Sequence, residues 1–196
     1  MNVSFIGLGV MGFPMSAHLI NKNNNLNIKV YNRSIEKTQN WISQNNGILT
    51  KSPSEAAEHS DIVFMCVGND KDVEQVVRGE NGIMSSIPEK SIIVDHTTAS
   101  SKIAKDLYHF CKDKKGVSFI DAPVSGGQAG AENGLLTIMV GGDESSYLKV
   151  EPLLKSYAKN TTLIGDSGSG QLAKMVNQIC IAGLLQGLSE AINFGQ

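Results

Sequence analysis

The sequence has few of the features that mark secreted, membrane-spanning or nucleic-acid-binding proteins. Its three cysteines, Cys66, Cys111 and Cys180, show no CxxC spacing, which indicates reduced thiols rather than a disulfide framework or a zinc site. The apolar stretch 179–185 is far shorter than the roughly 18 residues that span a bilayer. The 17 basic and 19 acidic residues are nearly balanced, and the N-terminus lacks a signal peptide's basic flank and cleavage site. We therefore expect a cytoplasmic protein with neither a nucleic-acid nor a membrane partner.

Short apolar runs alternate with longer amphipathic stretches through residues 1–165. The run 62–67 is apolar without alternation, as in a parallel strand buried on both faces. A short helix is expected after Ser52, which forms a capping box with Glu55 and is followed by Pro53 at the first helical position. The alternation predicts an α/β fold with a doubly wound, Rossmann-type, mostly parallel sheet. The strands are expected at residues 3–6, 28–31, 62–67, 92–94, 117–120, 135–140 and 161–164.

Residues 166–196 have a different pattern. From about residue 170 to 193 the sequence is helical, but apolar side chains cover nearly the whole circumference, so the helix must be buried. At about 1.5 Å per residue it would be about 35 Å long and would leave the first domain. Either the sequence is the N-terminal part of a longer protein or a partner chain covers the helix, and we favour the first. The predicted division is therefore a domain of residues 1–165 and an interdomain helix of residues 166–196.

A glycine-rich turn joins the first strand to the first helix. In the pattern GxGxxG, Gly7 permits the tight turn, Gly9 lets the backbone approach a pyrophosphate, and Gly12 allows close helix–strand packing. The free N–H groups at the helix start would hold the phosphates. The motif alone is weak, but its place in a strand–turn–helix–strand unit predicts dinucleotide binding rather than a merely structural turn. The expected contacts are Gly7, Leu8, Gly9, Val10, Met11 and Gly12.

The end of the second strand should meet the adenosine ribose. An NAD site has Asp or Glu here, whereas this sequence has Asn32, Arg33 and Ser34. Arg33 can pair with a 2′-phosphate, and the two polar neighbours can hydrogen-bond to it. We therefore predict NADP(H) as the preferred cofactor. In the alternative, Arg33 is a solvated surface charge and the cofactor is NAD(H).

Two further strand ends should face the same crevice. Val67 and Gly68 lie at the end of the strand 62–67, and Thr98 follows the strand 92–94. We count all three as cofactor contacts, although each could be an ordinary turn residue. His96 is a weaker candidate for ligand contact. The four histidines are scattered without metal-ligand spacing, so no metal site is expected.

Two segments carry residues suited to substrate chemistry. In the segment 121–131, Ser125, Gly126 and Gly127 make a concave loop whose N–H groups can receive a carboxylate, unless it is only a flexible turn. At the start of the last helix, Lys174 and Asn177 share one face. Partial burial would lower the pKa of Lys174 towards a value useful for proton transfer, with Asn177 orienting it. The alternative is a surface lysine.

Taken in order, three motifs resemble the β-hydroxyacid dehydrogenase family, which includes 3-hydroxyisobutyrate dehydrogenase, tartronate semialdehyde reductase and the glyoxylate/succinic semialdehyde reductases. The motifs are residues 7–15, 121–127 and 168–177. The resemblance implies that residues 125–127 bind the substrate carboxylate or hydroxyl, that Lys174 is the catalytic acid/base supported by Asn177, and that Thr98 lies near the nicotinamide. It also implies an all-helical C-terminal domain beyond this sequence and a homo-oligomer formed through it, so that the 196 residues alone would be inactive.

Two positions depart from the family pattern: Gln178 stands where an Asn is frequent, and Gly68 where many members have Pro. Our first hypothesis is an oxidoreductase that transfers a hydride between NADP(H), or NAD(H), and a small β-hydroxy acid or its semialdehyde. The second is a non-catalytic dinucleotide-binding module. A 6-phosphogluconate-type dehydrogenase is a third, but residues 128–131 supply no basic group for a substrate phosphate.

Overall fold

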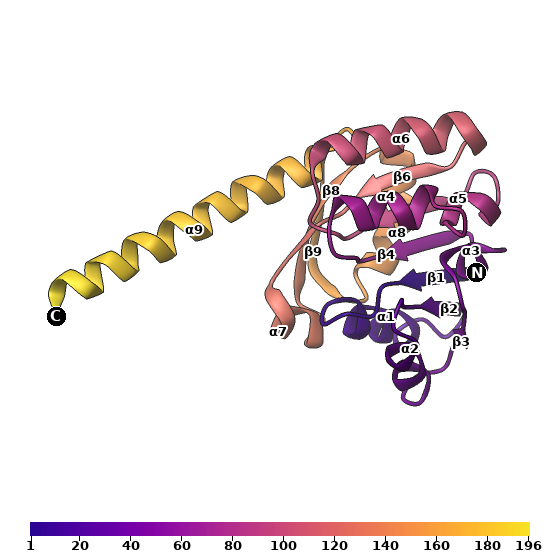
Figure 1. The fold of residues 1–196 in the computed structure, drawn as a ribbon, viewed down its shortest axis with the longest axis horizontal. Coiled ribbons are helices and arrows are strands. Elements are labelled where there is room, and N and C mark those ends of the chain that lie inside the picture. Colours follow the sequence, from indigo (N-terminus) through magenta and orange to yellow (C-terminus); the bar gives the residue numbers. More distant parts are fainter.

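The computed structural model describes residues 1–196 and shows a nine-stranded sheet from which one long helix projects (Figure 1). Hydrogen bonding orders the strands β3-β2-β1-β4-β5-β6-β8-β7, and β9 pairs with β8 outside this path. From β1 the sheet extends through β2 and β3 on one side and through β4, β5 and β6 on the other. The topological switch point therefore lies between β1 and β4. The strands are β1 (Asn2–Ile6), β2 (Asn27–Tyr31), β3 (Ile48–Leu49), β4 (Ile62–Met65), β5 (Ile92–Asp95), β6 (Ser118–Asp121), β7 (Val124–Ser125), β8 (Leu136–Gly141) and β9 (Ala158–Gly165).

The sheet is parallel from β3 to β6, and β8 enters it in the opposite direction. Asp121 at the end of β6 pairs with Gly141 at the end of β8, and β7 also runs antiparallel to β8. The first part of β8 and all of β7 therefore lie beyond the carboxyl edge of the parallel strands. The predicted Rossmann-type, mostly parallel fold is confirmed, whereas the two-residue strands β3 and β7 have no signal in the sequence.

Three of the helices begin at a side chain that accepts from their first free N–H groups. Ser52 Oγ accepts from the Glu55 N–H at 3.0 Å, so the helix expected after Ser52 is present. The Asn69 side chain accepts from the N–H groups of Lys71 and Asp72, and this cap starts the helix that begins at Asp70. The helices are α1 (Gly12–Asn21), α2 (Ile35–Ile42), α3 (Pro53–Ala57), α4 (Asp70–Arg78), α5 (Ile83–Ser86), α6 (Ser101–Lys115), α7 (Gly127–Glu132), α8 (Glu144–Leu154) and α9 (Ser169–Gly195).

Two apolar clusters, one on each face of the sheet, form the core. One joins Phe5 and Phe64 to the fully buried Trp41, and the other joins Val63 and Phe119 to helices α4 and α6. Successive residues of β4 belong to opposite clusters, because neighbouring side chains of a strand point to opposite faces. This explains why residues 62–65 are apolar without alternation.

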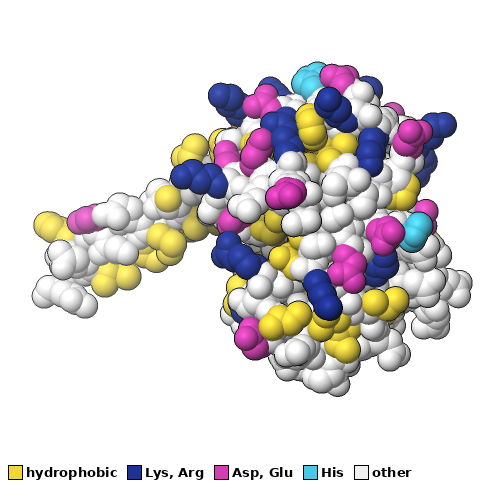
Figure 2. Space-filling model, turned by 45° about the vertical axis from the view of Figure 1, so that its right-hand side comes forward, with side chains coloured by type: hydrophobic (Ala, Val, Ile, Leu, Met, Phe, Trp, Pro, Cys, Tyr) yellow, Lys and Arg dark blue, Asp and Glu magenta, His cyan; other side chains and the backbone are white.

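Helix α9 projects far from the sheet (Figure 1). Its 27 residues correspond to about 40 Å, and the first turns pack against β8, β9 and α6. Beyond its first turns no other element of residues 1–196 covers its apolar circumference, so the cover that this pattern requires is not supplied within these residues. Figure 2 shows apolar side chains along the projecting part, and Phe194 is 94% exposed. No helix, α9 included, has the length and apolarity needed to cross a bilayer.

Candidate cofactor and substrate site

The turn between β1 and α1 has a geometry that only glycine satisfies at two positions. Gly7 has a φ of +95°, and a Cβ there would overlap the carbonyl of Cys66. A Cβ at Gly12 would overlap the carbonyl of Gly7, so helix α1 could not lie this close to the turn. A Cβ at Gly9 would meet no atom within 4 Å, because this residue faces open space. The three glycines therefore have different physical roles, as the motif predicts.

The turn presents unpaired backbone donors. The N–H groups of residues 9–12 donate to no acceptor in the protein, and they point away from the body of α1 at its N-terminus. Leu8 contributes differently, because its side chain is buried in the core and its N–H donates to Asn32 Oδ1 at 2.9 Å. Free donors at a helix N-terminus, beside a position left open by Gly9, fit the pyrophosphate of a dinucleotide.

A cleft of about 730 Å³ opens beside this turn. It is lined by ten of the predicted cofactor residues, all of which follow the carboxyl ends of β1, β2 and β4. These are Gly7, Gly9, Val10, Met11, Gly12, Asn32, Arg33, Ser34, Val67 and Gly68. Lys37, Lys51, Ser52 and Asp72 also line the cleft, although nothing local in the sequence marks them. They come from α2, the loop before α3, and α4, so only the fold brings them to the glycine turn.

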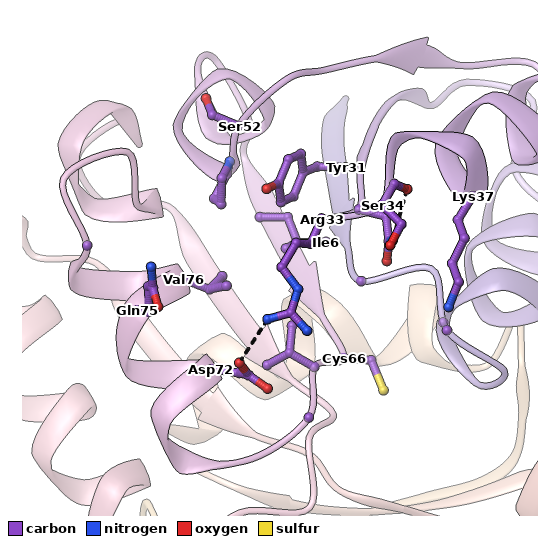
Figure 3. A pocket seen from close by; sticks show the side chains of 18 of the residues that line it. Ile6, Tyr31, Arg33, Ser34, Lys37, Ser52, Cys66, Asp72, Gln75 and Val76 are labelled. Atoms are coloured by element: carbon purple, nitrogen blue, oxygen red, sulfur yellow. Dashed lines mark hydrogen bonds and ion pairs between the residues drawn. The ribbon is translucent and has the colours of Figure 1, made fainter.

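Three cationic side chains line the cleft. Arg33, Lys37 and Lys51 all line it, together with the hydroxyl residues Ser34 and Ser52 (Figure 3). No acidic residue follows β2 directly, as the sequence indicates. These cations can bind an anion, while the carboxylates of Asp72 and Glu80 line the same cleft.

The loop after β5 connects to the cofactor loop after β4. The Val67 N–H donates to Thr97 Oγ1 at 3.0 Å, and the Thr97 N–H donates to Asp95 Oδ1 at 2.9 Å. Burial raises the pKa of Asp95 to about 7, although its hydrogen bonds with Thr97 oppose the rise and nearby Asp121 adds to it. Thr98 is exposed beside this network and does not line the dinucleotide cleft.

His96 lies inside the fold and does not reach the cleft. Its Nδ1 lies 2.7 Å from the Ala122 carbonyl and its Nε2 lies 2.9 Å from the Tyr157 hydroxyl. A carbonyl only accepts, so Nδ1 carries the hydrogen and Nε2 accepts from the tyrosine. Burial lowers the pKa of His96 to about 4, which keeps the ring neutral. The weak expectation that His96 contacts ligand is therefore wrong for this structure.

No group of three or more His, Cys, Asp or Glu side chains is placed to hold a metal ion.

Helix α9 is anchored to the sheet at its first turn. The Asp121 carboxylate accepts from the N–H groups of Gly168, at 2.6 Å, and Gln171, at 2.9 Å. The buried Gln171 side chain donates to the Thr97 carbonyl at 2.7 Å and accepts from the Ala99 N–H at 3.1 Å. The helix start is thereby fixed against the ends of β5 and β6.

Lys174 lies one turn beyond Gln171 on the same face of α9. It is only 9% exposed, its ammonium makes no hydrogen bond or ion pair within the protein, and burial lowers its pKa. Asn177 is partly exposed, and its amide donates to Gln178 Oε1 at 3.2 Å instead of contacting Lys174. The structure thus contains a partly dehydrated lysine, but it does not contain the predicted contact between Asn177 and that lysine.

The predicted substrate loop is ordered by β7 and α7. Ser125 pairs with Thr137 of β8, and the chain then turns through Gly126 and Gly127, whose φ angles are +131° and +63°. The N–H groups of both glycines donate to no protein acceptor. The segment is therefore a strand-to-helix turn rather than a flexible one, and it overhangs the carboxyl edge of the parallel strands.

A glycine turn at the switch point of a parallel sheet defines a dinucleotide-binding Rossmann domain. Residues 2–165 match the family described as the NAD binding domain of 6-phosphogluconate dehydrogenase. The chain belongs to the β-hydroxyacid dehydrogenase family and contains an NAD-binding domain over residues 2–165.

Similar proteins are consistent with this assignment. An uncharacterized oxidoreductase of Shewanella frigidimarina is 50% identical over 99% of this chain and 66% of its own length. The 2-hydroxy-3-oxopropionate reductase of Escherichia coli is 36% identical over 99% of this chain and 65% of its own. The structure of Mycobacterium tuberculosis 3-hydroxyisobutyrate dehydrogenase with L-serine superposes with a TM-score of 0.89 at 28% identity, covering 97% of this chain and 63% of that one. The chain therefore spans slightly less than two thirds of these relatives.

Proposed function

We propose that this chain is the cofactor-binding part of an enzyme that interconverts a small β-hydroxy acid and its semialdehyde. The observation that carries the proposal is the burial of Lys174 on α9, one turn from the Gln171 anchor at the loop after β5. In this proposal residues 1–165 form the dinucleotide-binding domain, and residues 166–196 form an interdomain helix that begins a helical domain through which the whole protein forms homo-oligomers. A nicotinamide dinucleotide bound at the carboxyl edge supplies or accepts the hydride.

Lys174 is the proposed general acid/base. Because burial lowers the pKa of Lys174, the ammonium gives up a proton more readily than a solvated lysine does. The ammonium donates its proton to the carbonyl oxygen during reduction, and the neutral amine takes it back from the hydroxyl during oxidation. Such positioned proton transfer contributes about 10²- to 10⁴-fold in rate. Asn177 would assist by contacting the substrate or by moving towards Lys174.

The substrate is a small carboxylate. The unpaired N–H groups of Gly126 and Gly127 and the hydroxyl of Ser125 support binding of its carboxylate or hydroxyl at the overhang formed by β7 and α7. Thr98 is the proposed neighbour of the nicotinamide, since it is exposed at the carboxyl end of β5.

NADP(H) is the proposed cofactor, with NAD(H) as the alternative. The support comes from Arg33, Lys37 and Lys51, which line the cleft and can pair with a 2′-phosphate, and from the lack of an acidic residue directly after β2.

The test is a panel of short semialdehydes assayed with NADPH and NADH on the intact gene product that carries this chain. The proposal expects reduction of at least one semialdehyde, and Lys174→Ala should abolish turnover while NADPH still binds. Lys149→Ala, on the exposed face of α8, is the matched control. Cofactor binding without turnover of any semialdehyde would favour the non-catalytic module, and undiminished turnover by Lys174→Ala would refute the role of the lysine.

A further inference from the structure

Arg33 and Asp72 meet across the mouth of the dinucleotide cleft. Arg33 follows β2 on one side of the cleft, Asp72 lies in the first turn of α4 on the other, and Arg33 Nη1 lies 3.5 Å from Asp72 Oδ1 (Figure 3). The arginine side chain is 88% exposed, and the aspartate side chain is 30% exposed. The guanidinium is thus held mainly by this one partner.

The Asp72 carboxylate lies close to the backbone of Gly68 in the cofactor loop. A Cβ at residue 68 would overlap Asp72 Oδ2, so the carboxylate occupies space that only glycine leaves free. Asn69 accepts from the Asp72 N–H and fixes the start of α4. The departure from the family pattern at Gly68 therefore has a physical counterpart, because it makes room for an acidic side chain beside Arg33.

An acidic group at this position acts differently on the two nicotinamide dinucleotides. A 2′-phosphate carries nearly two negative charges, so it must take the guanidinium from Asp72 and is repelled by the carboxylate that remains. A 2′-hydroxyl is neutral and can leave the ion pair in place. Asp72 therefore opposes one cofactor more than the other.

We propose that Asp72 is a specificity-determining residue that restrains Arg33 and lowers the preference of this site for NADP(H) over NAD(H). The inference rests on the proposed function, in which the adenosine ribose lies beside Arg33. Gly68 acts with Asp72, because the bare backbone at residue 68 is what admits the carboxylate.

The experiment measures the dissociation constants of NADPH and NADH by fluorescence titration of the intact gene product that carries this chain. Asp72→Asn keeps the side-chain shape and removes the charge. We expect it to tighten NADPH binding about two- to fivefold, the range that an exposed ion pair supports, and to leave NADH binding unchanged. The gain should shrink at 0.5 M NaCl, because salt screens exposed charges.

Two more variants make the test specific. Gly68→Ala should push the carboxylate away from Arg33. It should therefore shift the NADPH/NADH affinity ratio in the same direction as Asp72→Asn does. Glu74→Gln is the matched control, because Glu74 lies on the same helix outside the cleft and pairs with Arg78 at 2.8 Å. It should leave the ratio unchanged.

The failures of the two proposals differ. If Arg33→Ala lowers the NADPH/NADH affinity ratio but Asp72→Asn does not raise it, or if Glu74→Gln raises it equally, the role of Asp72 is overturned and the cofactor proposal stands. If Arg33→Ala leaves the ratio unchanged, or if neither nucleotide binds, the cofactor proposal is overturned and this inference with it.

Discussion

The side chain of Gln171, on helix α9, donates a hydrogen bond to the backbone carbonyl of Thr97 at 2.7 Å. The same side chain accepts from the Ala99 N–H, so one buried amide connects the helix that carries Lys174 to the loop that follows β5. That loop in turn holds the cofactor loop, because Thr97 Oγ1 accepts from the Val67 N–H. The helix that carries the proposed proton donor and the loop that carries proposed cofactor contacts are thus linked by a continuous set of hydrogen bonds.

The first prediction concerns Gln171→Met, which keeps the volume and removes both hydrogen bonds. We expect kcat with the best semialdehyde to fall about tenfold, because Lys174 is no longer held at a fixed distance from the loop, while the dissociation constant of NADPH stays nearly constant. Gln186→Met, an exposed position on the same helix that bonds Glu190, is the control. A lower Tm with unchanged kcat would show that Gln171 only stabilises the fold.

The second prediction concerns Arg33→Asp. The new carboxylate repels a 2′-phosphate and can accept from a 2′-hydroxyl, so preference should move towards NADH by tenfold or more. The measurement is the ratio of kcat/KM for the two cofactors. Lys155→Asp, an exposed cation paired with Glu151 away from the cleft, should leave this ratio as it is. An unchanged ratio in Arg33→Asp would mean that this residue does not discriminate between the cofactors.

The third prediction separates the roles of two glycines. Gly9→Ala should fold with a wild-type Tm, because its Cβ meets no atom within 4 Å, yet NADPH should bind at least tenfold more weakly since the methyl group enters the space for the pyrophosphate. Gly12→Ala should lower the free energy of unfolding by about 2–4 kcal/mol, because its Cβ overlaps backbone that cannot move aside. Thermal unfolding and NADPH titration of both variants check this, and equal Tm losses would contradict it.

The fourth prediction is a pH dependence of stability. The pKa of Asp95 is raised to about 7 in the fold, so between pH 4 and pH 7 the folded protein holds a proton that the unfolded chain has released. Asp95 therefore contributes stability at about pH 4 that is lost as pH rises through 7, with a limiting slope of about 1.4 kcal/mol per pH unit.

His96 acts in the opposite sense. Its pKa is lowered to about 4, so the unfolded chain binds the extra proton between pH 4 and pH 6.5, and stability rises with pH there. The two contributions nearly cancel in the wild type. Asp95→Asn should expose the His96 contribution, so that the free energy of unfolding, measured by urea titration, rises from pH 4 to pH 6.5 more steeply than in the wild type. Asp113→Asn, an exposed position, should follow the wild-type curve, and a flat difference for Asp95→Asn would contradict the prediction.

The fold and the glycine turn were predictable because their signals are local. The apolar run 62–67 marks a strand buried on both faces, and Gly7, Gly9 and Gly12 stand at fixed spacing after a strand. Lys51 and Asp72 carry no such signal, because they reach the cleft only after β1, β2 and β4 have come together. No local sequence pattern marks Gln171 either, since its partners Thr97 and Ala99 lie more than 70 residues away.

Other expectations failed for physical reasons. The sequence places His96 at a strand end, but the ring turns inward because the Ala122 carbonyl and the Tyr157 hydroxyl satisfy both nitrogens. Asn177 shares a face with Lys174, but sharing a face does not require contact, and the amide bonds Gln178 instead.

The opposite direction of β8 has a consequence for how such a site can change. Residues 126–135 connect two antiparallel strands at the rim of the sheet, so they can be lengthened or rebuilt without altering the parallel ladder or the pyrophosphate turn. In the proposed enzyme, new side chains there would change the surface that contacts the substrate carbonyl and leave the nucleotide-binding cleft unchanged. If the proposed function holds, a change of substrate can proceed through this rim alone.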